Sequence, residues 1–212
     1  MQCSIVITNF NYCGYVKEAI ESALLVSDDV IVIDDGSTDG SQELLLRDYN
    51  HFGQRRINLK LIANNGVAHA RNLGIKLAKY DYVICLDADD TLNPEIKNIS
   101  LNADIIAIGM QHFGDKNHEY LPPENLNLDS FKEFNQIPVS CPFSKRIWEK
   151  VGGFDQSLSG LEDYDFWVKC LKAGASICTT RKPLLNYRIH SRGRNIEATR
   201  NYKTLHAEIW KN

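Results

Sequence analysis

Apolar runs and amphipathic stretches succeed one another regularly along the first half of the chain. Short apolar runs that contain β-branched residues are typical of buried strands, and apolar residues three and four positions apart are typical of helices. Strands that alternate with helices form a parallel sheet with right-handed crossovers, so the pattern predicts an α/β fold. The strands are expected at 3–8, 30–33, 57–63, 82–86 and 105–110, and the helices at 16–25, 41–49 and 67–79.

The regular succession stops after residue 110, and the second half shows no such rhythm. A polar stretch, 112–138, contains Pro122 and predicts loops and short edge pieces. A short helix is expected at 143–150. A longer helix begins near Ser159 and Glu162, which fit a capping box, and runs to about residue 173. The remaining expected elements are closing strands at 176–179 and 184–190 and a last helix from about Glu197.

A chain of 212 residues is long enough for one domain with a sizeable core and short for two. The formal net charge of -3 argues against a nucleic-acid-binding protein of the basic-patch kind. The six cysteines form no C-x-x-C pair, which argues against zinc and favours a reduced cytosolic compartment. The chain begins without the pattern of a signal peptide, and no apolar run reaches the roughly twenty residues that a membrane span requires.

Three carboxylates, those of Asp87, Asp89 and Asp90, come directly after the apolar run 82–86. Ligands of parallel sheets bind at the carboxyl ends of the strands, and Asp87 and Asp89 point the same way if strand geometry continues through them. Carboxylates at a buried strand end repel one another unless a cation lies among them, and oxygen ligands favour Mg²⁺ or Mn²⁺, which neutralises phosphate oxygens. A solvated turn that caps the next helix explains the same residues, and this stretch alone leaves both interpretations open.

Two other strand-end loops, 8–11 and 34–39, offer groups suited to a nucleobase. Phe10 has a flat aromatic face, and the carboxylate of Asp35 can accept a ring N–H of uracil or guanine, which cytosine lacks. The alternatives are a core position for Phe10 and a glycine turn with a helix cap for 34–39. Arg71 lies among small and apolar residues of the third expected helix, where a surface ion pair and a contact with phosphate or carboxylate are both open.

Asp163 is a candidate general base. It lies three and four residues before Phe166 and Trp167 and therefore shares the apolar face of their helix. A carboxylate at the edge of a buried face, aimed inward, is suited to proton abstraction. Glu162 and Asp165 are explained instead by the preference of the first turn of a helix for acidic residues.

Taken together, these segments resemble the family-2 glycosyltransferases over nearly the whole chain. Each motif is short, whereas the order and spacing of the motifs together are specific. The resemblance implies the GT-A fold, a single domain with a Rossmann-like, mostly parallel sheet flanked by helices and a smaller mixed acceptor-side region. The motifs are Ile5–Asn11, Val32–Asp39, Asn65-Gly66, Ala70–Ile75, Leu86–Asp90, Val151–Asp155, Glu162–Trp167 and Tyr187–His190.

The resemblance also implies which residues form the site. Asp163 would be the catalytic base, with Glu162 and Trp167 on the acceptor side. Mn²⁺ or Mg²⁺ would be the cofactor, held by the D-x-D motif and a histidine, that is, by Asp87, Asp89 and His190. The residues expected to bind the nucleotide sugar are Thr8, Phe10, Asn11, Asp34, Asp35, Gly66, Arg71, Asp87, Ala88, Asp89 and Arg192.

The function that the resemblance implies is inverting transfer of a sugar from a nucleoside-diphosphate sugar, with UDP-sugar favoured, to an acceptor hydroxyl in surface polysaccharide or glycan synthesis. The expected partners are this donor and a sugar, lipid-linked glycan or other hydroxyl acceptor, without nucleic acid. Residues 1–110 would form the nucleotide-sugar-binding half and residues 111–212 the acceptor-binding half. A cytoplasmic location is expected, with peripheral contact at the inner membrane face left open. Where the family usually has a serine soon after His190, this chain has Arg192 and Arg194.

Two other classes of function stay open. Residues 86–92 also resemble the nucleophile motif of haloacid-dehalogenase-like phosphatases, D-x-D-x-T after an apolar strand, with Asp87 as the nucleophile. That family usually carries the motif on its first strand, whereas three strand–helix units precede it here. The second class is a non-catalytic subunit that binds a nucleotide sugar, although the presence of both Asp89 and Asp163 argues against it.

Overall fold

The computed structural model describes residues 2–49, 57–190 and 195–211. Its centre is a block of four parallel strands in the spatial order β3-β2-β1-β4. These are β1 (Ser4–Asn9), β2 (Val30–Asp35), β3 (Asn58–Ile62) and β4 (Tyr82–Asp87). All residues of β1 and β2 are buried, as is typical of apolar strands covered on both faces. The four strands confirm the first four that the hydrophobic pattern predicts.

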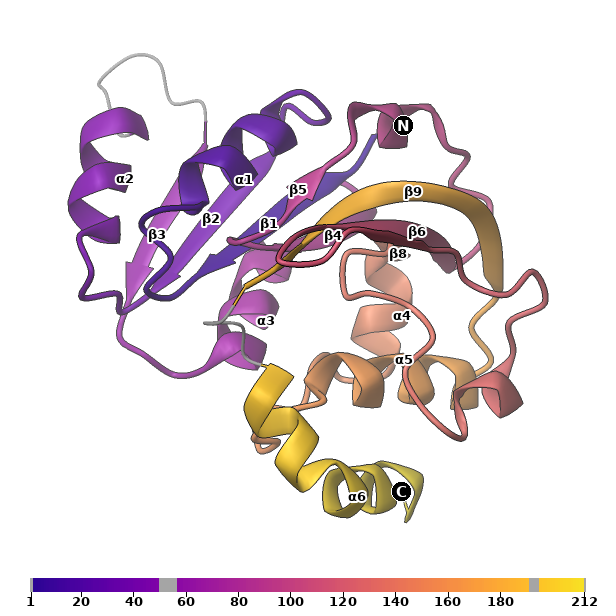
Figure 1. Cartoon of the computed structure of the whole chain (residues 1–212). Coiled ribbons are helices and arrows are strands. Elements are labelled where there is room, and N and C mark those ends of the chain that lie inside the picture. Colours follow the sequence, from indigo (N-terminus) through magenta and orange to yellow (C-terminus); the bar gives the residue numbers. More distant parts are fainter. Residues whose placement is uncertain (1, 50–56, 191–194, 212) are drawn as a thin grey trace.

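Helices cover both faces of this block (Figure 1). They are α1 (Val16–Leu24), α2 (Ser41–Tyr49) and α3 (Val67–Leu77). The chain moves in one direction across the sheet from β1 to β3 and then returns to the other side of β1 for β4. Right-handed crossovers therefore place α1 and α2 on one face and α3 on the other. The apolar face of α1 is buried at Val16, Ala19, Ile20 and Ala23, while Leu24 is half-buried.

The second half of the sheet is mixed. It contains β5 (Thr91–Leu92), β6 (Ile105–Gly114), β7 (His118–Tyr120), β8 (Phe143–Ser144) and β9 (Ile177–Ile189). Strand β8 pairs antiparallel with β4 and β6, and β6 runs parallel to β9, which in turn pairs antiparallel with β5. The predicted α/β domain, a mostly parallel sheet with a smaller mixed region, is confirmed.

Two details of the second half differ from the prediction. The closing strands expected at 176–179 and 184–190 are one long strand, β9, which curves over the sheet in Figure 1 and follows β6 through an irregular register near Gly109. Strand β6 also continues to Gly114, and β7 pairs with it inside the polar stretch 112–138. Partly exposed strands lack a continuous apolar run, so the sequence pattern does not reveal these extensions.

Three more helices and two short 3-10 turns complete the described structure. They are α4 (Lys145–Lys150), α5 (Glu162–Lys172), α6 (Asn195–Lys211), η1 (Pro94–Asn98) and η2 (Leu128–Phe131). Figure 1 shows α4 and α5 on the same side of the sheet as α3, with α6 beyond α5. The predicted capping box of α5 is wrong, because Leu161 precedes the helix with a φ of 57° and no side chain caps it. No helix in the described ranges is both long and apolar enough to cross a membrane.

The strand register aligns the ends that carry the candidate site. Thr8 lies beside Asp87 in the sheet, and Asn9 lies beside Asp34. Because these strands are parallel, the loops that follow β1, β2 and β4 all leave the sheet at the same edge. The three polar strand-end loops are therefore neighbours in space, as the sequence predicts.

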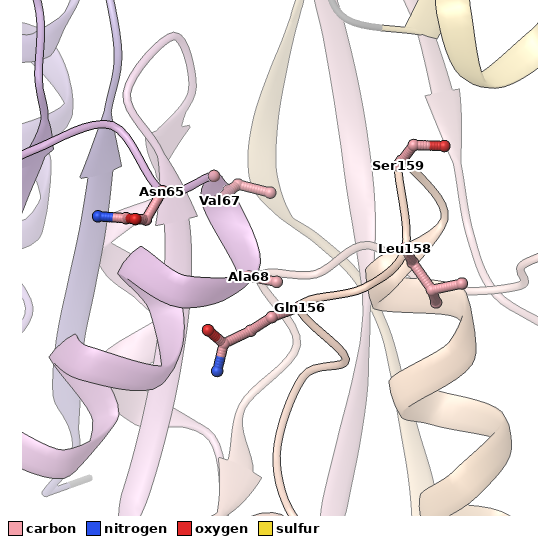
Figure 2. Close-up of a pocket in the computed structure, with 7 residues that line it drawn as sticks. Asn65, Val67, Ala68, Gln156, Leu158 and Ser159 are labelled. Atoms are coloured by element: carbon pink, nitrogen blue, oxygen red, sulfur yellow. The ribbon is translucent and has the colours of Figure 1, made fainter.

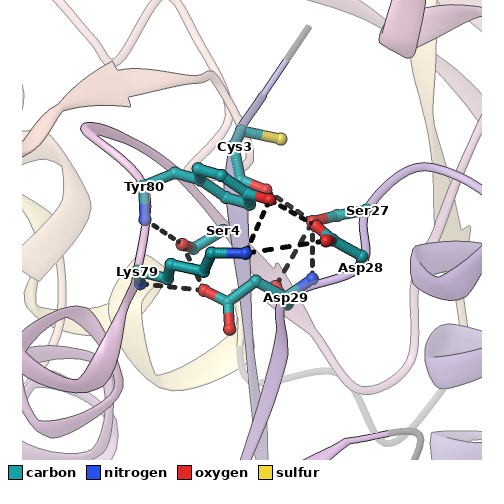
Figure 3. A network of polar contacts seen from close by, with 7 residues as sticks. All are labelled: Cys3, Ser4, Ser27, Asp28, Asp29, Lys79 and Tyr80. Carbon is teal, nitrogen blue, oxygen red and sulfur yellow. Dashed lines mark hydrogen bonds and ion pairs between the residues drawn. The ribbon is translucent and has the colours of Figure 1, made fainter.

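A polar network joins the chain segments at the amino ends of the strands (Figure 3). The hydroxyl of Ser4 donates to Asp29 Oδ2 over 2.5 Å and accepts from the amide of Tyr80 over 3.0 Å. Asp29 also accepts from the amide of Lys79, while the Tyr80 hydroxyl donates to Asp28. These contacts tie the start of β1 to the chain segments that follow α1 and α3. The amino ends of the strands are thus anchored to one another on the side away from the candidate site.

A glycine lets α3 lie close against β1. A Cβ atom added to Gly74 would lie 2.2 Å from Cγ1 of Val6, whose side chain is fully buried. No methyl group fits at this distance, so close packing on the sheet explains the glycine. Glycine costs a helix about 1 kcal/mol relative to alanine, and the close approach of helix and strand outweighs this cost.

We expect Gly74→Ala to lower the free energy of unfolding by about 1–3 kcal/mol, the usual cost of overpacking, although alanine is the better helix former. Chemical denaturation measures the change. In a Val6→Ala background the same substitution should become neutral or stabilising, because the clashing methyl groups are gone. Gly14→Ala is the control, since a Cβ atom there meets nothing within 4 Å. A stabilising Gly74→Ala in the wild-type background would contradict the close packing.

Candidate functional site

The buried carboxylate of Asp34 holds the loop after β2. Its Oδ2 accepts from Asn9 Nδ2 over 2.7 Å, and its Oδ1 accepts from the Ser37 amide over 3.0 Å and from Gln42 Nε2 over 2.8 Å. The side chain has no exposed surface. Asp34 therefore joins the loops after β1 and β2 through enclosed and already bonded oxygens, and the nucleotide contact expected for it stays a prediction.

Asp35 binds the turn that leads into α3. Its Oδ1 accepts from the amide of Asn65 and its Oδ2 accepts from the amide of Gly66, each over 2.9 Å. Gly66 has a φ of 87°, which glycine adopts without steric cost. A carboxylate oxygen has more than one acceptor position, so Asp35 can still accept a ring N–H. Asp35 and Gly66 are thus neighbours, as a shared donor site requires.

The loop after β1 presents Phe10 to solvent. Asn11 has a φ of 60°, and its Oδ1 accepts from the Thr38 amide over 2.7 Å, which fixes the loop. Phe10 is 44% exposed, so the core position considered for its ring is wrong. Thr8 is buried in the sheet beside Asp87. The exposed ring is therefore held by a rigid loop at the edge where the parallel strands end.

Arg71 bridges the two halves of the site. Its guanidinium donates to Asp87 Oδ1 over 2.7 Å and to Glu162 Oε1 over 2.8 Å. The Arg71 side chain is only 4% exposed, so the surface ion pair is wrong and the carboxylate contact is confirmed. Burial alone would lower the pKa of this guanidinium, but the charges of Asp87 and Glu162 raise the pKa above its usual value. The end of β4 and the start of α5 are thus held by one buried cation.

Asp89 and His190 meet at the turn after β4. Asp89 Oδ2 lies 3.0 Å from His190 Nε2. The rings of Tyr12 and Tyr15 flank the imidazole, with centroids 5.9 Å and 5.2 Å from its own. Burial raises the pKa of Asp89, and the negative charge of Asp87 adds to this rise. This turn therefore favours an additional positive charge.

The metal set expected from the sequence is assembled only in part. Strand β4 ends at Asp87, so strand alternation does not aim Asp87 and Asp89 the same way, and the two carboxylates contact Arg71 and His190 respectively. Across the described ranges, no three His, Cys, Asp or Glu side chains are grouped to hold a metal ion. A carboxylate and an imidazole are nevertheless ligands that Mn²⁺ accepts, and a cation beside Asp89 would offset the burial and the charge of Asp87 that raise its pKa. The chemistry of the pair fits a divalent ion.

Arg188 of β9 supports the same turn. Its amide donates to Asp90 Oδ1 and its Nε donates to the carbonyl oxygen of Asp89, each over 2.8 Å. Its guanidinium also reaches Glu18 of α1 over 2.6 Å and lies 4.6 Å from the ring centroid of Tyr15. Burial and the charge of Asp89 raise the pKa of Asp90 well above its usual range. Arg188 lies inside the motif Tyr187–His190, but the sequence assigns it no role, because its partner Asp90 is 98 residues away.

Asp163 lies in the first turn of α5 and is partly accessible to solvent. Its Oδ1 accepts from the amide of Tyr164 over 2.8 Å, and its Oδ2 accepts from Asn135 Nδ2 over 2.9 Å. Burial raises the pKa of Asp163 to about 6, with a further rise from Glu162 and an opposing effect from Arg71. This carboxylate combines access with raised proton affinity, as a general base requires. Asn135 escapes prediction because its polar surroundings carry no periodic pattern.

The remaining predicted site residues are Trp167, Glu162, Ala88 and Arg192. Trp167 is fully buried, with its ring against those of Phe143 and Phe166, and the acceptor-side role expected for it stays a prediction. It belongs to the core because it faces inward on α5. Glu162 is engaged by the buried arginine and does not cap the helix. Arg192 lies outside the described residues. Of the D-x-D motif, the middle residue Ala88 is buried.

A cavity of about 170 Å³ lies between the start of α3 and the chain that leads into α5 (Figure 2). It adjoins the turn that binds Asp35, because Asn65 and Gly66 line it. Its volume is below the roughly 300–1,000 Å³ that is typical of small-molecule sites. The other lining residues are Val67, Ala68, Gln156, Leu158 and Ser159.

Comparison with known proteins places the chain in a large group of enzymes. The family model described as Glycosyl transferase family 2 matches residues 4–147. An uncharacterized glycosyltransferase of Rickettsia typhi is 30% identical over 208 residues, which cover 88% of this chain and 64% of that relative. The chain therefore spans less than two thirds of the length of this relative.

Solved structures share the fold. Staphylococcus aureus TarS 1-349 in complex with UDP-GlcNAc superposes with a TM-score of 0.72 at 20% identity, over 93% of this chain and 61% of that chain. The mannosyltransferase PcManGT from Pyrobaculum calidifontis, in complex with GDP-Man and Mn2+, superposes with a TM-score of 0.72 at 16% identity, over 100% of this chain and 64% of that chain. Similarity at these identities concerns the architecture alone.

We expect Arg71→Ala to lower the free energy of unfolding by about 3 kcal/mol, the low end of the usual loss for a broken buried ion pair, because Asp87 retains access to water. Denaturant titration measures the change. Arg146→Ala is the matched control, since that arginine is 73% exposed and its partner Asp104 keeps the hydroxyl of Ser144. The control should change stability by about 1 kcal/mol or less. Equal losses in the two variants would show that the Arg71 bridge has no special structural weight.

Proposed function

The chain belongs to glycosyltransferase family 2, and from this premise we propose that it transfers a sugar from a nucleoside-diphosphate sugar to an acceptor hydroxyl, with inversion at the sugar carbon. The observation that carries the proposal is the ion-pair bridge from Asp87 through Arg71 to Glu162. It fixes the D-x-D turn relative to the start of the helix that holds Asp163. A donor site and a base at a fixed separation suit a single displacement, because orientation of the reacting groups lowers the barrier.

The groups at the ends of β1 and β2 support a uridine or guanosine diphosphate donor, with a UDP-sugar as the first to test. Phe10 offers an exposed ring face for the base, and Asp35 can accept the ring N–H that uracil and guanine share. Thr8 and Gly66 lie at the same edge and would complete this part of the site. TarS and PcManGT carry UDP-GlcNAc and GDP-Man in their structures, which supports the same two bases here.

Asp89 and His190, with Asp87 on the same turn, would hold a Mn²⁺ or Mg²⁺ ion. Bound there, the ion would neutralise the negative charge of the departing diphosphate. The chain itself prepares this turn, since Arg188 fixes the backbone of Asp89 and Arg71 holds Asp87. The Mn2+ in the PcManGT structure supports a divalent cofactor.

Asp163 would take the proton from the acceptor hydroxyl. Each of its oxygens accepts one hydrogen bond, which leaves acceptor positions for the incoming hydroxyl. As the proton moves to Asp163, the acceptor oxygen bonds to the sugar carbon, and the bond from that carbon to the diphosphate oxygen breaks on the opposite face. With a pKa of about 6, the carboxylate is mostly ionised at neutral pH yet still basic enough for this step. One displacement inverts the carbon, so no second carboxylate is required as a nucleophile.

In this proposal residues 1–110 form the donor half and residues 111–212 the acceptor half. The alternative of a phosphatase with Asp87 as nucleophile is set aside, because Asp87 is ion-paired with a buried arginine and the chain belongs to another family. A non-catalytic subunit that binds a nucleotide sugar is the remaining alternative. Substitution of Asp163 distinguishes the enzyme from such a subunit, since a binding protein would have no turnover to lose.

We expect Asp163→Asn to lower kcat by a factor of about 100 to 10,000, because the amide keeps the size of the side chain but cannot accept a proton. The Kd of the nucleotide sugar should stay nearly unchanged, which is the mark of a group used chiefly in the transition state. Release of nucleoside diphosphate from UDP- and GDP-sugars measures turnover, with slow donor hydrolysis as the readout when no acceptor is supplied. Asp165→Asn is the matched control, since Asp165 is buried and paired with Lys169 over 2.8 Å.

The pH dependence provides a second readout of the same carboxylate. Because the pKa of Asp163 is raised to about 6, the base is ionised above that pH and protonated below it. The kcat/KM should therefore fall as the pH decreases through about 6. The titratable and charged groups that act on Asp163 are Glu162, Arg71, Asp87 and the thiol of Cys141. Full activity of the wild type at about pH 4, or near-wild-type transfer by Asp163→Asn, would rule out Asp163 as the base.

Donor binding should depend on the nucleobase of the donor and on a divalent ion. Calorimetric titration in Mn²⁺ should give tighter binding for UDP or GDP than for CDP, and EDTA should weaken it. Asp89→Asn should reduce the part of the donor affinity that depends on Mn²⁺. It should not lower the Tm of the free protein, since one of several mutually repelling carboxylates is removed. Asp28→Asn, at an exposed carboxylate, is the control. Tightest binding to CDP would refute the role of Asp35, and equal affinities in EDTA and Mn²⁺ would refute the metal site.

A further inference from the structure

The chain from Phe131 to Gln136 leaves η2 without forming another helix or strand, yet its backbone is firmly held. We refer to these residues as the 131–136 segment. Four of its carbonyl oxygens accept hydrogen bonds, three from tyrosine hydroxyl groups and one from a histidine ring nitrogen. The bonds run from Tyr164 of α5 to Phe131, from His206 of α6 to Lys132 (2.8 Å), from Tyr202 of α6 to Glu133 (2.6 Å) and from Tyr120 of β7 to Gln136 (2.9 Å).

One face of α6 supplies much of this support. Tyr202, His206 and Trp210 are spaced four residues apart and therefore lie along one side of the helix. The carbonyl oxygen that faces His206 cannot donate, so Nε2 of this histidine carries the proton. Trp210 Nε1 donates to the hydroxyl of Tyr164 over 2.8 Å, and that hydroxyl donates to the carbonyl oxygen of Phe131. The segment is thus fixed from outside by α5, α6 and β7.

The two residues between the fixed carbonyls face the candidate site and the solvent. Asn135 Nδ2 donates to Asp163 Oδ2 over 2.9 Å, while its Oδ1 accepts from the amide of Ile137 over 3.3 Å. The second bond orients the amide group, so that its NH₂ side is the one aimed at the base. The neighbouring Phe134 is 49% exposed, although a phenyl ring gains most when it is buried. A rigid segment therefore presents an aromatic ring one residue from the group that contacts Asp163.

An isolated exposed ring in polar surroundings is suited to a sugar. The C–H groups on one face of a sugar ring are apolar and carry partial positive charge, which matches the negative face of a phenyl ring. Lys132 and Glu133 beside Phe134 are exposed and polar, so they can meet the hydroxyl groups at the rim of such a ring. A lipid chain would require a broader apolar patch. Among the described residues, the other exposed large apolar side chains lie elsewhere: Phe10, Leu25, Leu46, Leu61 and Leu77.

We propose that the 131–136 segment recognises the acceptor, and that the acceptor is a carbohydrate whose ring packs on Phe134 while Asn135 orients Asp163 towards its hydroxyl group. This inference rests on the proposed transferase function and assigns its acceptor class. Phe134 determines specificity through direct contact. Asn135 is a positioning residue, because it acts on the reaction through Asp163. The hydrogen bonds from α6 hold the backbone of Lys132 and Glu133, directly before these two residues.

Sugar binding at Phe134 is tested without turnover. The probes are the methyl glycosides of glucose, galactose, N-acetylglucosamine and N-acetylgalactosamine, observed by saturation-transfer NMR with and without UDP and Mn²⁺. Wild type should contact the C–H groups of one sugar face, Phe134→Ala should weaken that binding by about tenfold, and Phe134→Tyr should retain it. Leu46→Ala, at an exposed apolar side chain of α2, is the matched control. Equal binding by Phe134→Ala and wild type, or no binding of any glycoside to wild type, overturns the carbohydrate assignment.

The role of Asn135 is tested through the pH profile. The Asn135 amide stabilises the ionised form of Asp163, so Asn135→Ala should move the acid limb of kcat/KM to higher pH and lower kcat while the donor Kd stays unchanged. Asn135→Asp should move the limb further, because it adds a negative charge beside the base. Asn127→Ala removes a structural amide, the cap of η2, and should lower the Tm without moving the limb. An unmoved acid limb in both Asn135 variants overturns the positioning role.

The two proposals fail in distinguishable ways. Absence of turnover with every nucleotide sugar would count against the transferase function, whereas glycoside binding is measured on the protein at rest. If the protein turns over a nucleotide sugar but Phe134→Ala binds the glycosides as well as wild type does, only the acceptor assignment is overturned. In an Asp163→Asn background, Asn135→Ala should cause no further loss of donor hydrolysis, because the group it positions has gone; an equal further loss would show that Asn135 acts elsewhere.

Discussion

A single buried guanidinium connects parts of the chain that are distant in sequence. Arg71 lies 16 residues from Asp87 and 91 residues from Glu162, and it contacts both. An arginine removed from water is tolerated only when carboxylates replace its hydration, so neither partner can turn away without leaving a charge uncompensated. The start of α5 adapts to this requirement. Glu162 faces the arginine, and Leu161 takes a left-handed conformation in front of a helix that no side chain caps.

The same requirement explains why so much negative charge can gather at one edge of the sheet. Asp87 and Glu162 share Arg71, Asp90 accepts from the amide of Arg188, and Asp89 faces an imidazole. Burial and mutual repulsion nevertheless raise the pKa of Asp89 and of Asp90. A region that binds protons more readily than usual also binds other cations readily. The electrostatics of this edge therefore favour a ligand that brings positive charge with it.

The sequence predicts the parallel half of the fold well, because buried strands and amphipathic helices leave a strong periodic pattern. It also predicts that the three strand-end loops lie together, since parallel strands deliver their loops to one edge. It fails where the relevant property is set by tertiary contacts. The capping role of Glu162 is wrong, because the side chain is engaged by Arg71 instead. Asn135 is absent from the prediction and Arg188 receives no role in it, as their partners lie 28 and 98 residues away.

The bonds from α6 to the 131–136 segment also impose an order on assembly during synthesis. Tyr202 and its partner Glu133 are 69 residues apart, whereas β1 and β2 pair within the first 35 residues. Contacts between close segments form early, and a chain made from its N-terminus folds its first units before the rest emerges. A growing chain can therefore pair β1 with β2 while the 131–136 segment beside Asp163 still lacks its support from α6.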